Sequence, residues 1–388
     1  SIEVGMPERE IATRFKETVI FSSSYLEGIC GDYDGDQVTI KIIWTQEANE
    51  EVQSAMESPN FFITATGSNI REIGKEGLQT IYMMTKDSDD KSKVIRDPDT
   101  LRKFLNRPAE DYTFTFFNDT FANRRVGDKI LRSRYQTNDI VEIPANFNAG
   151  ENWKFKNSTV IKTTLGRIFF NKIIIEGCGM ENVIGFVNRT VAKKSFYALE
   201  AEISSHVKEG DLTTKQMRKY IDHRDWMGYQ FYAVICASFT EKTLSVPPEV
   251  KALKKQLLTK YKKELEAGDE KVCEDIENQL IKKTEELLDD DPGMDFFKSG
   301  SKLSTGNNLK NITLMRGAVM NPVTGEYDII TNSFLDGMEK DKFAAHSNAL
   351  VMGAYPKAVG TADSGYLSKQ LSAAMQTQII DKDGSNCG

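Results

Sequence analysis

The first clear hydrophobic pattern lies at residues 38–44. Apolar residues alternate with polar ones from Val38 to Trp44, and Thr39 and Lys41 stand between the first apolar positions. A period of two places all the apolar side chains on one face of an extended backbone. The segment is therefore predicted to be a β-strand with one buried face.

A helical pattern follows at once. Thr45 is a good N-cap residue for residues 46–57, and Glu47 places a negative charge in the first turn, where the helix dipole favours it. Pro59 is expected to end this helix. A helical stretch interrupted by Gly74 and Gly77 is predicted over residues 68–87. Short strands are predicted over 61–66, 112–117 and 139–147, with a mixed apolar region at 158–175.

Residues 247–291 are predicted to form a helical hairpin. Apolar residues keep helical spacing before and after Gly268, which interrupts the pattern. Most of the remaining positions are Lys or Glu. This composition favours a two-helix arm exposed to solvent over a specialised site.

The last fifty residues are rich in alanine and favour a helix, yet they contain four helix-weakening residues. An interior proline costs about 3 kcal/mol and each glycine about 1 kcal/mol relative to alanine, so together they cost roughly 6 kcal/mol. Either the segment contains loops, or it is a helix whose weak points have a use. The four residues are Gly353, Pro356, Gly360 and Gly365.

Composition narrows the classes of protein. The net charge is −7, which taken alone argues against a nucleic-acid binder, although a large assembly needs positive charge only in its channel. No apolar run is long enough to span a membrane and no signal peptide opens the chain. The five cysteines have no CxxC spacing, so we expect reduced thiols and no zinc site.

The most specific chemistry lies in the stretch "GDYDGDQ", residues 31–37, which holds Asp32, Asp34 and Asp36. Two like charges 4 Å apart repel by about 4 kcal/mol at an effective dielectric of 20, so the trio favours a bound cation. Hard oxygen ligands in a tight cluster suit Mg²⁺. A helix-loop-helix calcium site is excluded by Ile43, where that loop requires Glu. A solvated acidic turn and a purely structural metal site remain alternatives.

This stretch resembles the NADFDGDQ signature of the largest (β′) subunit of multisubunit, DNA-dependent RNA polymerases. Further segments resemble that family in the correct order, and the resemblance covers about residues 28–87 and 155–388. The segments are "GLQTIYMMTKD" (77–87), "TTLGRIFFN" (163–171), "KSGSKLSTGNNLKNITLMRGAV" (298–319), "NSFLDGMEKDKFAAH" (332–346) and "GTADSGYLSKQL" (360–371).

The resemblance implies a nucleotidyltransferase. Asp32, Asp34 and Asp36 would hold the catalytic Mg²⁺, and a second Mg²⁺ would arrive with the NTP. The RNA 3′ end would attack the NTP, so no side-chain nucleophile is needed. The function implied is RNA synthesis on a DNA template during transcription, by an enzyme that is active only as a complex.

The resemblance also identifies the C-terminal helix as the family's bridge helix, which contacts nucleic acid beside the active centre. Thr361 and Ala362 match the pair that packs under the templating base, and Tyr366 follows them as a third expected nucleic-acid contact. Small side chains at that place let a base pair come close. The helix departs from the family at Val351 and Met352, where relatives carry an Arg-Lys pair.

The implied fold is α+β: part of a double-psi β-barrel catalytic domain, then a mostly helical pore or funnel region, then a long bridge helix. The expected domains are residues 1–87 (barrel portion with the metal loop), 88–154 (insertion or small lobe), 155–245 (pore region), 246–292 (helical hairpin), 293–337 (loop region), 338–377 (bridge helix) and 378–388 (tail).

The family's β′ subunits are far longer than 388 residues, so we expect a fragment or a naturally split subunit. A split β′ resembles the RNA polymerases of giant bacteriophages, which would place the enzyme in the host-cell cytoplasm or in the virion. The expected protein partners are β-like subunits, a C-terminal β′ piece with the trigger loop and a promoter-specificity factor. The expected ligands are the DNA template, the RNA product and NTPs, and no membrane association is expected.

Two other functions remain open. The two-barrel RNA-dependent RNA polymerases share the barrel and a DxDGD loop, although the match at "TADSGYL" argues against them. A non-catalytic assembly subunit that keeps a relic metal loop is the other alternative.

Overall fold

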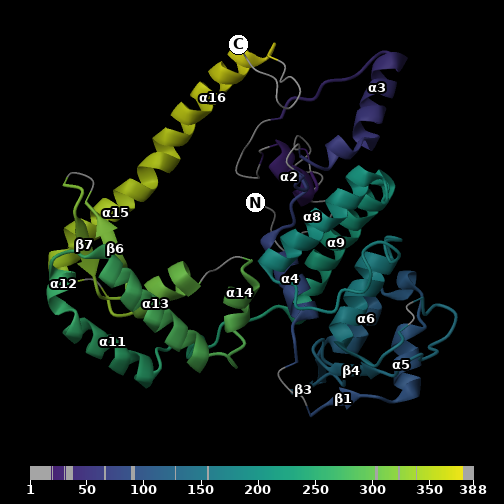
Figure 1. Cartoon of the computed structure of the whole chain (residues 1–388), viewed down its shortest axis with the longest axis horizontal. Helices are drawn as coiled ribbons and strands as arrows, with labels where there is room; N and C mark the ends of the chain where they lie inside the picture. Colours follow the sequence, from purple (N-terminus) through teal and green to yellow (C-terminus); the bar gives the residue numbers. More distant parts are fainter. Residues whose placement is uncertain are drawn as a thin grey trace. The chain divides into compact units, whose positions relative to one another are not determined.

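A computed structural model describes residues 19, 21–29, 31, 38–64, 67–88, 92–126, 128–154, 157–301, 305–321, 324–337 and 339–378. The chain divides into two compact units, which are described separately (Figure 1). Unit 1 comprises residues 1–238 and 292–303, and unit 2 comprises residues 239–291 and 304–388.

Unit 1 is mostly helical. Its α-helices are α2 (Ser23–Ile29), α3 (Gln46–Glu57), α4 (Lys75–Thr85), α5 (Pro98–Leu105), α6 (Phe114–Phe121), α7 (Leu165–Phe170), α8 (Lys193–Glu209), α9 (Thr214–Ile235) and α14 (Met294–Ser299). Short 3₁₀ helices lie at Pro59–Phe61 and Ala109–Asp111, and a π-helical segment extends α7 over Asn171–Glu176. The strands are β1 (Val94–Ile95), β2 (Arg124–Val126), β3 (Lys129–Leu131), β4 (Ile140–Ile143) and β5 (Ile161–Thr164).

The centre of unit 1 is the crossing of helices α4 and α9. Gly77 and Gly228 face each other there, and a Cβ on Gly228 would lie 2.7 Å from the Cα of Gly77. The Thr80 hydroxyl donates to the Gly228 carbonyl at 2.7 Å. The predicted interruption at Gly77 is therefore wrong, because this glycine lies inside α4, where the close approach of another helix requires it.

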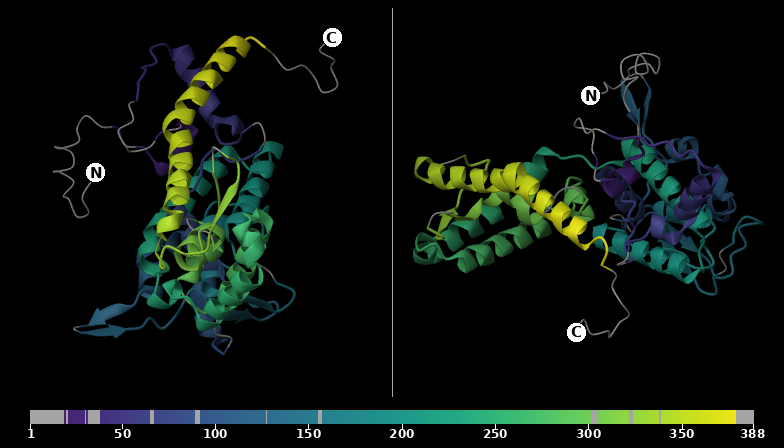
Figure 2. Two further views of the ribbon diagram at one scale, coloured as in Figure 1. Left: turned by 90° about the vertical axis from the view of Figure 1, so that its left-hand side faces the viewer. Right: turned by 90° about the horizontal axis from the view of Figure 1, so that it is seen from above.

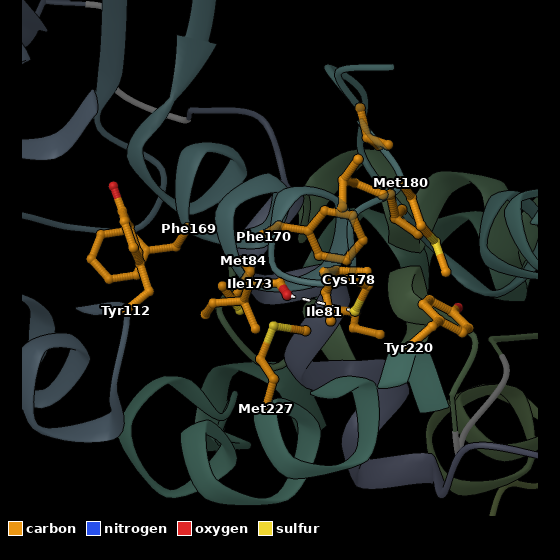
Figure 3. Packing of buried hydrophobic residues seen from close by; sticks show 14 of the residues in the cluster. Ile81, Met84, Tyr112, Phe169, Phe170, Ile173, Cys178, Met180, Tyr220 and Met227 are labelled. Carbon is orange, nitrogen blue, oxygen red and sulfur yellow. Dashed lines mark hydrogen bonds between the residues drawn. The ribbon is translucent and has the colours of Figure 1, made fainter. Parts of the chain in front are cut away.

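The core around this crossing combines α4, α7, α9 and the following π-helical segment. Figure 3 shows Ile81 and Met84 of α4, Phe170 and Ile173 beside them, and Met227 of α9 packed together. All five side chains are buried. Burial of such side chains contributes roughly 1.5–3 kcal/mol each, which makes this cluster the main stabilising element of unit 1.

The lobe at residues 88–154 has its own aromatic packing. Phe117 of α6 stacks on Phe231 of α9 with ring centroids 3.8 Å apart. Residues 112–117 were predicted to form a strand, and this is wrong, because α6 begins at Phe114 with Thr113 as N-cap. Phe114, Phe117 and Phe121 recur at intervals of three and four, which is a helical period.

A three-stranded sheet with the order β1-β4-β5 takes β1 and β4 from this lobe and β5 from the segment that follows it. Strand β4 pairs parallel with β1 and antiparallel with β5. The strand predicted over 139–147 is therefore confirmed at Ile140–Ile143. Strands β2 and β3 form a separate antiparallel hairpin.

No barrel is present among the described residues, whose sheets have two or three strands each. Residues 38–44 are not a strand: no described residue pairs with them, and the Trp44 side chain is 85% exposed. Residues 61–64 likewise form only an isolated bridge between Ile63 and Asn69. An extended segment becomes a strand only when a neighbouring backbone takes its hydrogen bonds, so alternation alone misled the prediction.

The described residues of unit 2 form helices and one β-hairpin. Its helices are α10 (Glu241–Leu244), α11 (Pro248–Lys260), α12 (Lys262–Glu266), α13 (Glu270–Leu287), α15 (Phe343–Tyr355) and α16 (Thr361–Met375). π-Helical segments lie at Thr305–Leu314 and Pro356–Gly360, and a 3₁₀ turn lies at Lys340–Lys342. Strands β6 (Gly317–Met320) and β7 (Tyr327–Ile330) pair antiparallel. In the described part of the whole chain, no helix has the length and apolarity to cross a bilayer.

The predicted helical hairpin is confirmed as α11, α12 and α13, and Gly268 takes the left-handed conformation between the last two helices. It is not a solvated arm. Ile276 and Leu280 of α13 are buried in one cluster with Leu314 and Ile329. The hairpin therefore forms the core of unit 2 rather than projecting from it.

The C-terminal segment is helical from Phe343 to Met375 and contains no loop (Figure 2). The residues around Pro356 form a π-helical turn instead. A proline has no N–H for the preceding carbonyls, and one wider turn absorbs this loss without breaking the helix. The backbone N–H of Thr361 bonds the carbonyl of Pro356, five residues back.

Candidate functional site

The predicted metal ligands Asp32, Asp34 and Asp36 lie outside the described residues. The two flanks of the loop are described, and they differ. Helix α2 precedes the loop and ends with the Gly31 N–H bonded to the Leu26 carbonyl at 3.0 Å. On the other side, the residues from Val38 to Trp44 are extended and exposed. Only the first flank is packed onto unit 1.

One buried arginine makes that packing. The guanidinium of Arg71 lies 4.3 Å from the ring centroids of both Tyr25 on α2 and Phe61. It also donates to the Phe61 carbonyl at 3.0 Å. Burial lowers the pKa of Arg71, yet arginine stays protonated in proteins, so a cation remains in contact with both rings.

A buried ion pair lies beneath Arg71. Arg224 of α9 and Glu200 of α8 are 2.6 Å apart, and Arg224 also donates to the Arg71 carbonyl at 2.8 Å. The Tyr220 hydroxyl and the Asn69 amide donate to the same Glu200 oxygen. Burial raises the pKa of the Glu200 carboxyl, and its bonds to Arg224, Tyr220 and Asn69 oppose that rise.

This network was not predicted from the sequence. A signal was present, because Arg224 recurs at helical spacing with the core residues Met217, Ile221 and Phe231 of α9. A charged residue on an otherwise apolar stripe indicates a buried partner, since buried charges are almost always paired. The sequence did not reveal that the partner was Glu200.

Two of the resembling segments, 77–87 and 163–171, meet in unit 1. Arg167 is buried and donates to the Thr85 carbonyl at 2.8 Å and to the Asp87 carboxylate at 2.6 Å. Its neighbour Gly166 lies so close to α4 that a Cβ there would overlap the Met84 carbonyl oxygen. The residues that these segments share with the family thus join α7 to the end of α4, and Arg167 has a structural role.

The predicted nucleic-acid contacts Thr361, Ala362 and Tyr366 lie together on α16 and are all exposed, and the Tyr366 side chain is 66% exposed. The Thr361 hydroxyl donates back to the Pro356 carbonyl at 3.1 Å, so its proton is engaged, while its methyl group and the acceptor lone pairs of its oxygen remain for contacts. Among the described residues, α16 buries none of its side chains. The helix therefore presents a small-residue step followed by an aromatic ring.

The base of this helix is fixed to unit 2. Ala345 is buried with Val319 and Ile330 of the β6–β7 hairpin. The ring of His346 packs edge-on against Phe334 with centroids 5.9 Å apart, so packing is its described role. Val351 and Met352, which stand where the resemblance would place an Arg-Lys pair, are both exposed. They leave apolar surface at a position where charge was expected.

Two other sets of potentially reactive or metal-binding side chains lie outside these segments. His206, Glu209 and Asp211 bring one ligand atom each within 4.8 Å of the others at an exposed turn. The thiols of Cys178 and Cys273 are buried, and burial raises the pKa of each to about 12, so both are inert at neutral pH. Neither group lies in a segment that carries the resemblance.

No family model matches the chain. Its curated relatives are DNA-directed RNA polymerase β′ subunits. The subunit of Ruthia magnifica is 23% identical over an alignment of 397 positions, which covers 93% of this chain and 26% of the relative. Those of Chloroherpeton thalassium and Flavobacterium johnsoniae are 24% and 25% identical, and each match includes 92% of this chain. The chain is thus a distant, partial homologue of β′, and it spans about a quarter of the length of the relatives.

Proposed function

We propose that this chain is the catalytic part of a β′ subunit in a multisubunit DNA-directed RNA polymerase. The observation that carries the proposal is the match of 93% of the chain to bacterial β′ subunits. The acidic loop, the joined segments of unit 1 and the exposed C-terminal helix all lie in the order that the resemblance requires. A phage enzyme with a split β′ remains our proposal for its origin.

The chemistry of the donor set fits Mg²⁺. Asp32, Asp34 and Asp36 supply hard carboxylate oxygens within five residues, which suits a small divalent ion. When bound with the ion that accompanies the NTP, this metal lowers the pKa of the RNA 3′-hydroxyl and stabilises charge on the phosphates. The chain's own task is to hold the carboxylates together, and α2 anchors the start of their loop.

The C-terminal helix would act on the template. Thr361 and Ala362 leave room for a base pair to approach the helix, and the Tyr366 ring offers a surface on which a base can stack. The exposed apolar residues on the same helix would contact the partner subunits, which we propose to be a β-like subunit and a C-terminal β′ piece. In this proposal the chain alone is inactive.

The decisive experiment is RNA synthesis by the assembly reconstituted with its copurifying subunits. Wild-type chain should extend RNA on DNA but not on RNA templates, which separates it from an RNA-dependent polymerase. Asp34→Asn should abolish Mg²⁺-dependent extension while assembly survives, and Asp99→Asn, at an exposed position of the lobe, should change neither. Normal extension by the Asp34→Asn assembly would refute the catalytic role.

The nucleic-acid role of the helix needs its own test. Ala362→Leu would fill the space proposed for the base pair, and a displacement of about 1 Å can slow a reaction about a hundred-fold. Ala373→Leu adds the same side chain at another exposed position of α16 and serves as the matched control. Equal rates for the two variants would place the nucleic acid elsewhere.

A further inference from the structure

Arg71 holds an unusual position for a charged residue, because only 6% of it is exposed. Its guanidinium lies over the rings of both Tyr25 and Phe61, 4.3 Å from each centroid, and the two rings also contact each other with centroids 6.3 Å apart. Tyr25 belongs to α2, whereas Phe61 belongs to the segment after α3. The side chain therefore joins α2 to the body of unit 1, by a contact that strengthens when water is excluded.

Helix α2 is shaped to accept this side chain. A Cβ on Gly28 would lie 2.9 Å from Nη1 of Arg71, so the helix passes directly over the guanidinium where it has no side chain. The helix then closes with the bond from Gly31 to Leu26. Asp32 is the next residue of the chain, so the arginine lies under the last turn before the acidic loop.

The backbone of Arg71 is held by two side chains. Its N–H donates to the Asn69 side chain at 2.8 Å, and its carbonyl accepts from Arg224 at 2.8 Å. Arg224 is in turn bonded to Glu200 at 2.6 Å. Both polar backbone groups of Arg71 are thus held by side chains whose own positions are set by helices α8 and α9.

We infer that Arg71 is a positioning residue that fixes where the acidic loop begins. Its side chain holds α2, and its backbone is held in turn by the Glu200–Arg224 pair. This inference rests on the proposed function of the loop. Lysine would not replace it, because a guanidinium can contact two rings and donate to a carbonyl at the same time, whereas an ammonium is a single point charge. Supporting groups around metal ligands affect metal affinity by about 10- to 100-fold when they are removed.

The test uses the reconstituted assembly with Arg71→Met, which keeps the length of the side chain and removes the charge and the fork. We expect half-maximal RNA extension to require roughly ten-fold more Mg²⁺. Fe²⁺ with peroxide in place of Mg²⁺ cleaves protein beside a bound ion, and cleavage near residue 34 should weaken in parallel. Arg71→Lys should recover only part of either signal.

The matched control is Arg218→Met. Arg218 also lies over Phe61 and Phe62 and donates to the Met56 carbonyl, but it belongs to α9 and its described contacts do not include α2. Both variants should lower the melting temperature similarly, and only Arg71→Met should change the Mg²⁺ dependence. Equal Mg²⁺ dependence at lowered melting temperature would overturn the positioning role. If Asp34→Asn leaves extension and cleavage unchanged, the proposed function itself fails.

Discussion

Helix α9 and the C-terminal helix of α15 and α16 are both long, yet they differ in what covers them. Helix α9 buries residues from Met217 to Phe231 against α4 and α6. Helix α16 buries none, and Tyr366 and Leu371 are more than half exposed. Apolar side chains contribute to stability only where other elements remove them from water. Helix α9 is covered by other elements of this chain, and we propose that α16 is covered by other subunits of the assembly.

The largest expected effect is at the buried ion pair of unit 1. Arg224→Met removes the partner of Glu200 and the bond to the Arg71 carbonyl, and breaking a buried pair costs about 3–5 kcal/mol. Chemical denaturation should show this loss, whereas Lys219→Met, at an exposed position of the same helix, should stay within about 0.5 kcal/mol.

The same variant should acquire a pH dependence. Burial already raises the pKa of the Glu200 carboxyl, and removing Arg224 takes away the main opposing effect. A carboxyl with a raised folded-state pKa binds its proton more tightly in the folded protein, so stability rises as the pH falls through that pKa. Arg224→Met should thus regain stability as the pH falls from neutral toward acid values. Adding Glu200→Gln should remove this pH dependence, and a dependence that persists would implicate another group.

A smaller loss is expected where two helices touch by their backbones. Gly166→Ala would push a methyl group into the Met84 carbonyl oxygen, and overpacking of this kind costs about 1–3 kcal/mol. The melting temperature of unit 1 should fall while that of unit 2 stays unchanged. An unchanged unit 1 would mean that the end of α4 shifts freely, and that the joined segments are not rigid.

These sites also show how much the sequence could predict. Helix α3 was predicted to its end residues, because Thr45 is a local signal that acts on the nearest N–H groups. The helical hairpin was predicted from its period and from Gly268. The strand predicted at residues 38–44 is wrong, because pairing depends on a distant backbone that no local pattern reveals. The Glu200–Arg224 pair was missed for the same reason, since its two residues come from different helices.

The candidate site divides in the same way. The motif comparison identified Asp32, Asp34 and Asp36 and the pair Thr361 and Ala362, and these assignments remain predictions. Arg71 carries no motif, because its role comes from two rings and a glycine that lie together only in the folded chain. Supporting residues of this kind are found from structure, whereas metal ligands are found from sequence.

The exposed helix should respond to its surroundings rather than to its own chain. Leu371→Lys should change the stability of the free chain by less than about 0.5 kcal/mol, because the side chain is already in water. In the assembly the same change should weaken binding by about 2 kcal/mol, or roughly 30-fold, as expected for a buried interface residue. The matched control is Gln370→Lys, which adds the same charge at the preceding position. Equal weakening by both variants would mean that charge, and not apolar burial, governs assembly.

The smallest expected effect has the opposite sign to that of Gly166→Ala. Gly353 lies inside α15 with open space around its Cα, so Gly353→Ala should stabilise the free chain by about 0.5–1 kcal/mol. Gly365→Ala, also in open space, should give the same gain in thermal unfolding. If the helix bends at Gly353 during nucleotide addition, Gly353→Ala should also slow RNA extension, since a stiffer helix opposes the bend. Faster or unchanged extension would show that the flexibility of Gly353 serves no step of the reaction. Any bending of the helix would then be assigned to the π-helical turn at Pro356.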